Sequence, residues 1–125
     1  MSGQIPELPA LGARENEVMQ VVWALGPIVA DDVRAQLKSR LKESTVRTVL
    51  TRLEAKGYLT HTVVGRTYLY AAAAARGEVA ARAVRNIVDE ICQGSVDELL
   101  SGLVESRVVT LSHIEALRFR AAAKS

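Results

Sequence analysis

The fold is decided by residues 44–70, STVRTVLTRLEAKGYLTHTVVGRTYLY, where a helical pattern changes abruptly into a strand pattern. In the first half, apolar residues recur at i, i+3, i+4 and i+7, the spacing of one buried helix face: Val46, Val49, Leu50 and Leu53. We expect a helix over residues 44–56, with Ser44 as its N-cap and Gly57 as its left-handed end.

Directly after Gly57, the pattern becomes that of a β-hairpin. Residues 58–64 are rich in β-branched and aromatic side chains, Gly65-Arg66 supplies a turn, and residues 67–70 return with alternating character. We therefore expect two short antiparallel strands with a glycine at the tip.

Two further helices are predicted before this stretch. Residues 11–25 carry an apolar stripe, begin near Gly12 and end at Gly26-Pro27. Residues 30–39 form the second helix, with two aspartates in the first turn, where carboxylates favour the positive helix end. Three helices followed by a hairpin is the order of a winged helix-turn-helix, so the fold class is mainly α with a small β-hairpin wing.

The chain after the hairpin has a different character. An alanine run, residues 71–75, predicts a boundary between two domains, 1–75 and 76–125. We expect the first to be a winged-helix DNA-binding domain and the second a helical dimerisation domain, for the reasons that follow. Helices are expected over residues 78–93, from a capping box at Ser95, and from a second capping box at Ser112. The apolar faces of these helices are too thin for an independent core, so we expect the helices to pair with those of a second subunit. The expected dimerisation residues are Val84, Ile87, Val88, Ile91, Leu99, Leu100, Leu103 and Val104.

Charge and composition narrow the functional class. The 125-residue chain has a net charge of +2, but residues 34–66 hold eight basic residues against two acidic ones, a local balance of +6. Such a concentration is expected of a phosphate-binding surface. No apolar run approaches the roughly 20 residues of a membrane helix, and no export signal is visible, which predicts a cytoplasmic protein.

The polar face of the third predicted helix is typical of one that enters the DNA major groove. It carries short hydroxyl side chains and arginines, which suit phosphates and base edges. Arg47 is expected to read guanine and Arg52 to hold a phosphate, while Arg66 at the wing tip is placed to reach the minor groove or its bordering phosphate. The predicted DNA-binding residues are Ser44, Thr45, Arg47, Thr48, Thr51, Arg52 and Arg66.

The sequence argues against catalysis and cofactors. Cys92 lies in an apolar helical pattern, where a small buried residue is the usual explanation. His61 and His113 lack partners at the spacing of a catalytic triad or a zinc site. No phosphate-binding glycine loop is present. We therefore expect no enzymatic activity, no metal and no cofactor.

Over residues 11–117 the sequence resembles the penicillinase repressor family, which includes the β-lactamase and methicillin-resistance repressors and copper-responsive relatives. The resemblance rests on LGARENEVM at 11–19 with Val22-Trp23, on the pattern T-V-x-T-[LVM]-L-x-R-L-x-x-K-G at 45–57, on G-R-x-Y-x-Y at 65–70, and on Leu111-Ser112. It implies a homodimeric repressor that binds an inverted-repeat operator through the third helix, in control of β-lactam resistance or another stress response.

The resemblance also implies two regulatory features to compare. In the β-lactam branch, a membrane sensor-protease system inactivates the repressor by cleavage at an Asn-Phe bond; the matching position here, Gly102-Leu103, departs from that pattern. The copper branch carries a Cys-x-Cys hook, which a chain with only Cys92 cannot form.

Two other functions fit the same pattern. A dimeric winged-helix regulator that senses a small molecule would need a pocket, and the chain has one Phe and one Trp with which to line it. A winged helix used only for protein–protein assembly would not need the +6 segment.

Overall fold

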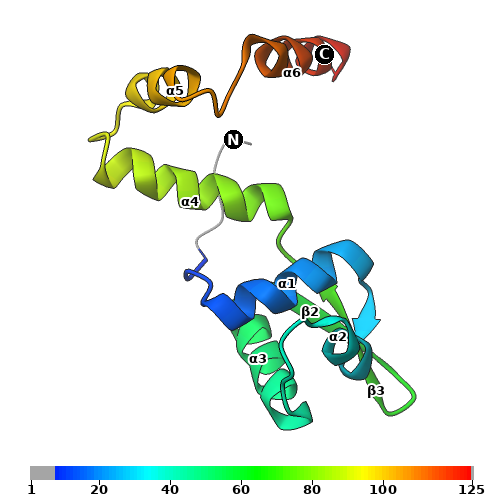
Figure 1. The fold of residues 1–125 in the computed structure, drawn as a ribbon. Helices are drawn as coiled ribbons and strands as arrows, with labels where there is room; N and C mark the ends of the chain where they lie inside the picture. The colour runs from blue at the N-terminus through cyan, green and yellow to red at the C-terminus, as the bar shows by residue number, and fades with distance from the viewer. Residues whose placement is uncertain (1–7, 125) are drawn as a thin grey trace. The chain divides into compact units, whose positions relative to one another are not determined.

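The computed structural model describes residues 8–124 as a mainly helical chain with one small antiparallel sheet (Figure 1). The elements are α1 (Ala13–Leu25), β1 (Ile28–Val29), α2 (Ala30–Gln36), α3 (Glu43–Ala55), β2 (Leu59–Val64), β3 (Thr67–Ala72), α4 (Arg76–Glu90), α5 (Val96–Glu105) and α6 (Leu111–Lys124). The expected fold class is confirmed. The chain forms two compact units that divide between Ala83 and Val84, inside α4.

In the first unit, helices α1, α2 and α3 pack with the sheet around one core. The buried faces agree in large part with the predicted periodicity: Val18, Met19 and Val22 are buried on α1 and Val33 on α2. Leu25, which continues the apolar stripe of α1, is exposed instead, because it is the last residue of the helix. The α3 stripe is also buried: Val46, Val49, Leu50 and Leu53. Leu50 and Leu53 are fully buried, so truncating either to alanine is expected to cost about 2–5 kcal/mol.

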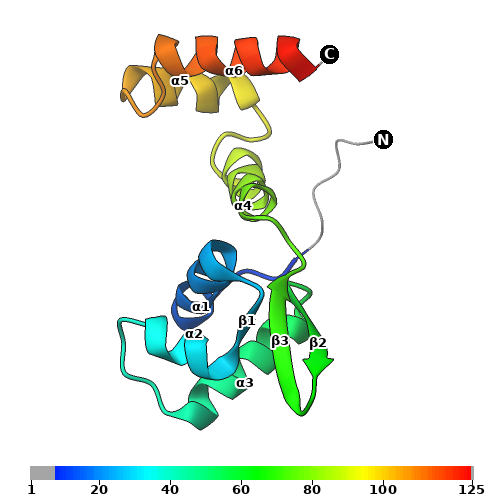
Figure 2. The same cartoon turned by 90° about the vertical axis from the view of Figure 1, so that its right-hand side faces the viewer.

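The sheet has three strands in the order β1-β3-β2 (Figure 2). β2 and β3 pair from Leu59 opposite Ala72 to Val64 opposite Thr67, as the hairpin pattern predicted. Gly65 at the tip has φ +65°, a conformation that glycine adopts without strain. β1 was missed because a two-residue strand is too short to show a period; it pairs only with Leu69 and Tyr70.

Helix ends account for most of the errors in the sequence prediction. α2 ends at Gln36, three residues earlier than expected. The prediction of Ser44 as N-cap is wrong: α3 begins at Glu43, Lys42 holds the N-cap position, and no side chain caps the helix. A carboxylate in the first turn favours this earlier start, because it interacts with the positive helix end. Gly57, with φ +92°, ends α3 as expected.

The alanine run is part of the folded unit rather than a simple linker. Ala71 and Ala72 complete β3, and Ala74 is buried in the core. The indole Nε1 of Trp23 donates a 2.8 Å hydrogen bond to the carbonyl oxygen of Ala74, and the guanidinium of Arg76 lies 5.5 Å from the centre of the Trp23 ring. The start of α4 is therefore fastened to α1.

The second unit runs from the later part of α4 through α6. Ser95 caps α5, accepting a hydrogen bond from the Glu98 backbone N–H as predicted. The capping box expected at Ser112 is wrong: α6 starts at Leu111, and the hydroxyl of Thr110 accepts a hydrogen bond from the His113 backbone. Among the described residues, no helix combines the length and apolar character needed to cross a membrane.

Candidate nucleic-acid interface

The exposed face of α3 carries the residues that the sequence analysis selected. Ser44, Arg47, Thr48, Thr51 and Arg52 are exposed, and Thr45 is half-buried. The opposite face of the helix is the core stripe. The division of α3 into a core face and a polar face is therefore the one that the sequence indicated.

One hollow joins α3 to the wing. It has a volume of about 360 Å³, and it is lined by Arg47 and Thr51 of α3 and by Arg66, Thr67, Tyr68 and Tyr70 of the hairpin. Val29, Ala30 and the acidic Asp31 also line it. Two cations, one carboxylate and several hydroxyl groups from segments far apart in sequence thus line a common space, with a net positive charge. We call it the α3–wing groove. Such a surface can accept a phosphate or the polar edge of a base.

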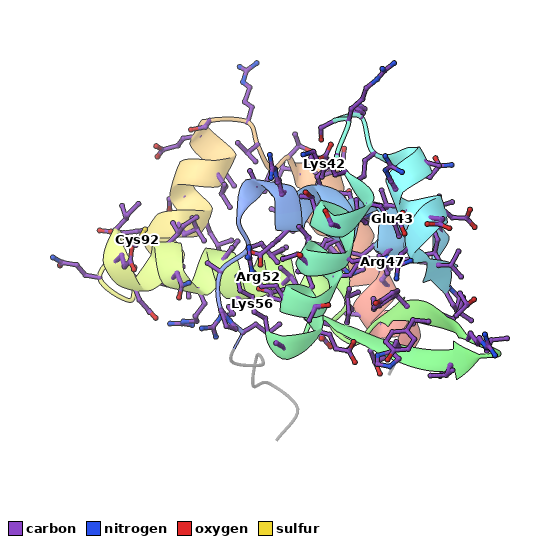
Figure 3. All side chains as sticks on the ribbon, turned by 90° about the horizontal axis from the view of Figure 1, so that it is seen from below. Lys42, Glu43, Arg47, Arg52, Lys56 and Cys92 are labelled. Atoms are coloured by element: carbon purple, nitrogen blue, oxygen red, sulfur yellow. The ribbon has the colours of Figure 1, made fainter. Side chains whose placement is uncertain are left out.

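The remaining predicted residues lie on the other side of α3. Ser44, Thr45, Thr48 and Arg52 line a second hollow of about 510 Å³ with residues 12–15 at the start of α1. Figure 3 shows Arg47 on the hairpin side of α3 and Arg52 with Lys56 on the other side. The predicted residues therefore form two groups around one helix.

Arg47 forms an ion pair with Glu43 on the same helix, a contact that was not predicted from the sequence. Its Nη2 lies 3.1 Å from Oε1 of Glu43, and its Nε donates a 3.2 Å hydrogen bond to the same oxygen. Because both side chains are more than half exposed (60% and 56%), this i, i+4 pair contributes about 0.5 kcal/mol or less. An incoming anion can displace it at little cost. The i, i+4 spacing was a signal that could have revealed it.

Two of the threonines on α3, Thr48 and Thr51, use their hydroxyl hydrogens within the helix. Thr48 Oγ1 donates to the carbonyl of Ser44 and Thr51 Oγ1 to the carbonyl of Arg47, each at 2.9 Å. Their oxygen lone pairs remain as acceptors, and their methyl groups remain for apolar contact. Contacts with base amino groups and thymine methyls suit them better than donation to phosphate in this rotamer.

A buried ion pair fixes the start of α1 against the end of α3. Lys56 Nζ lies 2.7 Å from Oε1 of Glu15, which also accepts a 2.7 Å hydrogen bond from the Gly12 backbone N–H. Burial raises the pKa of Glu15, but the hydrogen bonds from Lys56 and Gly12 outweigh it and hold the pKa below its ordinary value. Within the described part of the chain, Oε2 of Glu15 is buried with no hydrogen-bond partner. No sequence spacing predicts a pair 41 residues apart.

The predicted dimerisation residues are largely exposed in the single chain. Val84, Ile87, Ile91, Leu100 and Val104 are exposed, and Leu99 and Leu103 are half-buried. The expectation that Val88 is an exposed apolar residue is wrong, because it is 2% exposed within the single chain. Further apolar side chains are exposed on α6: Leu111, Ile114, Leu117 and Phe119.

The candidate cleavage position, Gly102-Leu103, lies inside helix α5. The Gly102 carbonyl accepts a hydrogen bond from the Ser106 N–H, and the Leu103 carbonyl accepts from Val108 and Val109. A protease needs an extended chain, so this bond becomes a substrate only if α5 unwinds locally.

Cys92, labelled in Figure 3, is half-buried, with a free thiol. Within residues 8–124, no group of three or more His, Cys, Asp or Glu side chains gathers as a metal site would.

Comparison with known proteins identifies the family. The profile of the penicillinase repressor family matches residues 11–122. An uncharacterised 16.5 kDa protein encoded in the ptsI 3′ region of Latilactobacillus sakei is 30% identical over 108 residues, which cover 85% of this chain and 73% of that protein. The methicillin resistance regulatory protein MecI of Staphylococcus aureus is 23% identical over 110 residues, covering 86% of this chain and 89% of MecI.

A solved structure is similar over more than half of this chain. The monomeric form of Bacillus licheniformis BlaI, determined in complex with the blaP half-operator, superposes with a TM-score of 0.50 at 31% identity, covering 58% of this chain and 90% of that one. The family is one of repressors rather than of enzymes. The chain described here belongs to the penicillinase repressor family, whose members are DNA-binding transcriptional repressors.

Proposed function

We propose that this protein represses transcription as a homodimer on an inverted-repeat operator, with α3 and the wing of each subunit reading one half-site. The observation that carries the proposal is the α3–wing groove, in which Arg47 and Thr51 of the helix and Arg66 of the hairpin line one hollow. A helix in the major groove flanked by a wing needs this juxtaposition, because base edges and the neighbouring backbone must be met together.

The distribution of charge supports the same use of the surface. The +6 segment, residues 34–66, contains α3 and the hairpin turn, whereas the basic and acidic residues from Arg76 onward cancel. The similar monomeric form of BlaI was determined in complex with the blaP half-operator, which favours one subunit as the unit that reads a half-site.

The exposed apolar side chains of the second unit support the dimer. A surface with Ile87, Ile91, Leu100 and Val104 exposed is costly in water, and pairing with the same surface of a second copy would remove it. We assign the interface to the predicted set, with Val88 buried inside each subunit.

The regulated process is proposed from the relatives. MecI is named for methicillin resistance. The corresponding role for this protein is to control β-lactam resistance or another stress response, acting in the cytoplasm. A membrane sensor-protease partner is compatible with this role, but Gly102-Leu103 inside α5 would have to unwind before cleavage.

A selection experiment tests the proposal. Duplexes enriched by the full chain from a random pool should contain two inverted half-sites whose centres lie about one or two helical turns apart. Enrichment of no sequence, with uniform weak binding to all duplexes, would contradict specific repression. Enrichment of a single half-site would contradict the dimer.

A further inference from the structure

His61 on β2 makes two contacts that its place in the sequence did not predict. Its Nδ1 lies 2.7 Å from both carboxylate oxygens of Glu54 on α3. Its ring stacks on Tyr68 of β3, with ring centres 4.0 Å apart and an interplanar angle of 8°. Tyr70, directly opposite His61 in the register, lies at a tilt with a centre-to-centre distance of 5.9 Å. The imidazole therefore connects the hairpin to α3.

The contact with Glu54 continues the line of residues that forms the α3–wing groove. Arg47, Thr51 and Glu54 stand at i, i+4 and i+7, so they share one face of α3. Arg47 and Thr51 line the groove on the helix side, while Tyr68 and Tyr70 line it on the hairpin side. His61 and Glu54 do not themselves line the groove, but their contact joins the helix that forms one wall to the hairpin that forms the other.

The hairpin needs such a connection because its outer half has little other support. β1 pairs with β3 only at Leu69 and Tyr70, so the sheet has two strands beyond Leu69. Val63, Val64 and Tyr68 in that outer part are exposed. A two-stranded ribbon is only marginally rigid by itself.

We propose that His61 is a positioning residue for DNA binding, which holds the wing at a set distance from α3 so that Arg66 and Arg47 reach the DNA together. The role rests on the proposed function. Fixing the wing in its bound position before the DNA arrives lowers the entropy lost on binding. His61 acts through Arg66 and itself needs no contact with the DNA.

The negative charge of Glu54 could itself weaken DNA binding by offsetting a nearby arginine, an effect separate from its contact with His61. Glu54 is one of two carboxylates in the +6 segment, and it shares a helix face with Arg47. The variant Glu54→Gln separates these two effects. It removes the negative charge but keeps an oxygen that can accept a hydrogen bond from His61.

The test is a double-mutant cycle between His61 and Arg66. His61→Phe keeps a ring to stack on Tyr68 but has no donor for Glu54. Affinity for a selected duplex is measured at one salt concentration for the unaltered protein, His61→Phe, Arg66→Ala and the double variant. We expect His61→Phe to weaken binding by about tenfold, as for the loss of one hydrogen bond to a charged group, and to add little once Arg66 is gone. Thr62→Ala, on the exposed outer face of the same strand, is the matched control and should bind normally.

Two further measurements complete the test. Glu54→Gln should retain most of the affinity, and in the absence of DNA, ¹⁵N relaxation at Arg66 should report faster motion in His61→Phe than in Thr62→Ala. Losses that multiply in the double variant, or unchanged motion at Arg66, would overturn the role of His61 while leaving the proposed function intact. A lack of specific binding by the unaltered protein would overturn both.

Discussion

Glu15, in the first turn of α1, and Lys56, at the C-cap of α3, form an ion pair of 2.7 Å across 41 residues of sequence, with Glu15 only 5% exposed. The lysine Nζ also donates to the carbonyl of Ala10 at 3.1 Å. This cluster lies next to the hollow that contains Arg52, so it sets where the start of α1 meets α3.

Replacing Lys56 with methionine should destabilise the protein. The change keeps the aliphatic stem but leaves the buried Glu15 carboxylate without its cation. Because a quarter of the Lys56 side chain is exposed and water can partly replace it, we expect a loss of about 2–3 kcal/mol, less than for a fully buried pair. Urea unfolding measures it, with the exposed Lys38→Met as the control. Equal midpoints for the two variants would show that the pair is not stabilising.

Stability should fall in acid partly through Glu15. Its pKa in the folded protein lies below the ordinary value of 4.5, so its contribution is complete above that value and is lost as the pH falls through the lower, folded pKa. Glu15→Gln should be less stable at neutral pH and should lose less stability between pH 5 and 3. Urea midpoints across this range test the prediction, and parallel curves for the two proteins would contradict it.

DNA binding should depend steeply on salt, because Lys and Arg side chains that neutralise phosphates release counterions. With about six phosphate contacts per dimer, affinity should fall by about three orders of magnitude between 50 and 200 mM salt. Fluorescence anisotropy with a selected duplex measures the slope. A nearly flat dependence would be incompatible with a phosphate-binding role for the +6 segment.

Arg47 and Arg66 should differ in what they contribute. Arg47→Ala is expected to cost about 1–3 kcal/mol and to relax preference at one base position, since in the proposed complex α3 presents this side chain to the major groove. Arg66→Ala should weaken binding to all sequences by a similar factor, because in the proposed complex the wing tip contacts the DNA backbone. Competition with single-base operator variants distinguishes them; a uniform loss for Arg47→Ala would make it a phosphate contact.

The proposed dimer is best probed on the exposed apolar surface of α5. Leu100 is 49% exposed in the single chain, so Leu100→Asp should leave each subunit folded and dissociate the dimer. Leu103 is half-buried and therefore a less specific probe. Sedimentation should show that this variant is a monomer. Its affinity for the operator should be low, because it has lost the multiplied affinity of two linked half-site contacts. A variant that stays dimeric would place the interface elsewhere.

Truncation tests the same point from the other side, and the structure alters where to cut. Ending the chain after Ala75 would remove Val79, which packs on the core, and Arg76, which lies over Trp23. A chain ending at Ala83 keeps the whole first compact unit and should be a folded monomer.

The sequence by itself determined the winged-helix fold and the family. Buried residues recur every three to four positions along α1 and α3, and the β2–β3 hairpin has a glycine at its tip. Local residue spacing is therefore sufficient to predict these elements without knowledge of distant contacts. The polar face of α3, with Arg47 and Arg52, follows from the same periodicity.

Only the tertiary structure decided which of those side chains share a space. The division of α3 between the wing side and the α1 side, the Glu15–Lys56 pair and the contact of His61 with Glu54 all join segments that meet through packing of the core. The short strand β1 and the burial of Val88 depend on it in the same way. Contacts of this kind depend on how whole elements pack in three dimensions, and residue spacing along the chain carries no record of that packing.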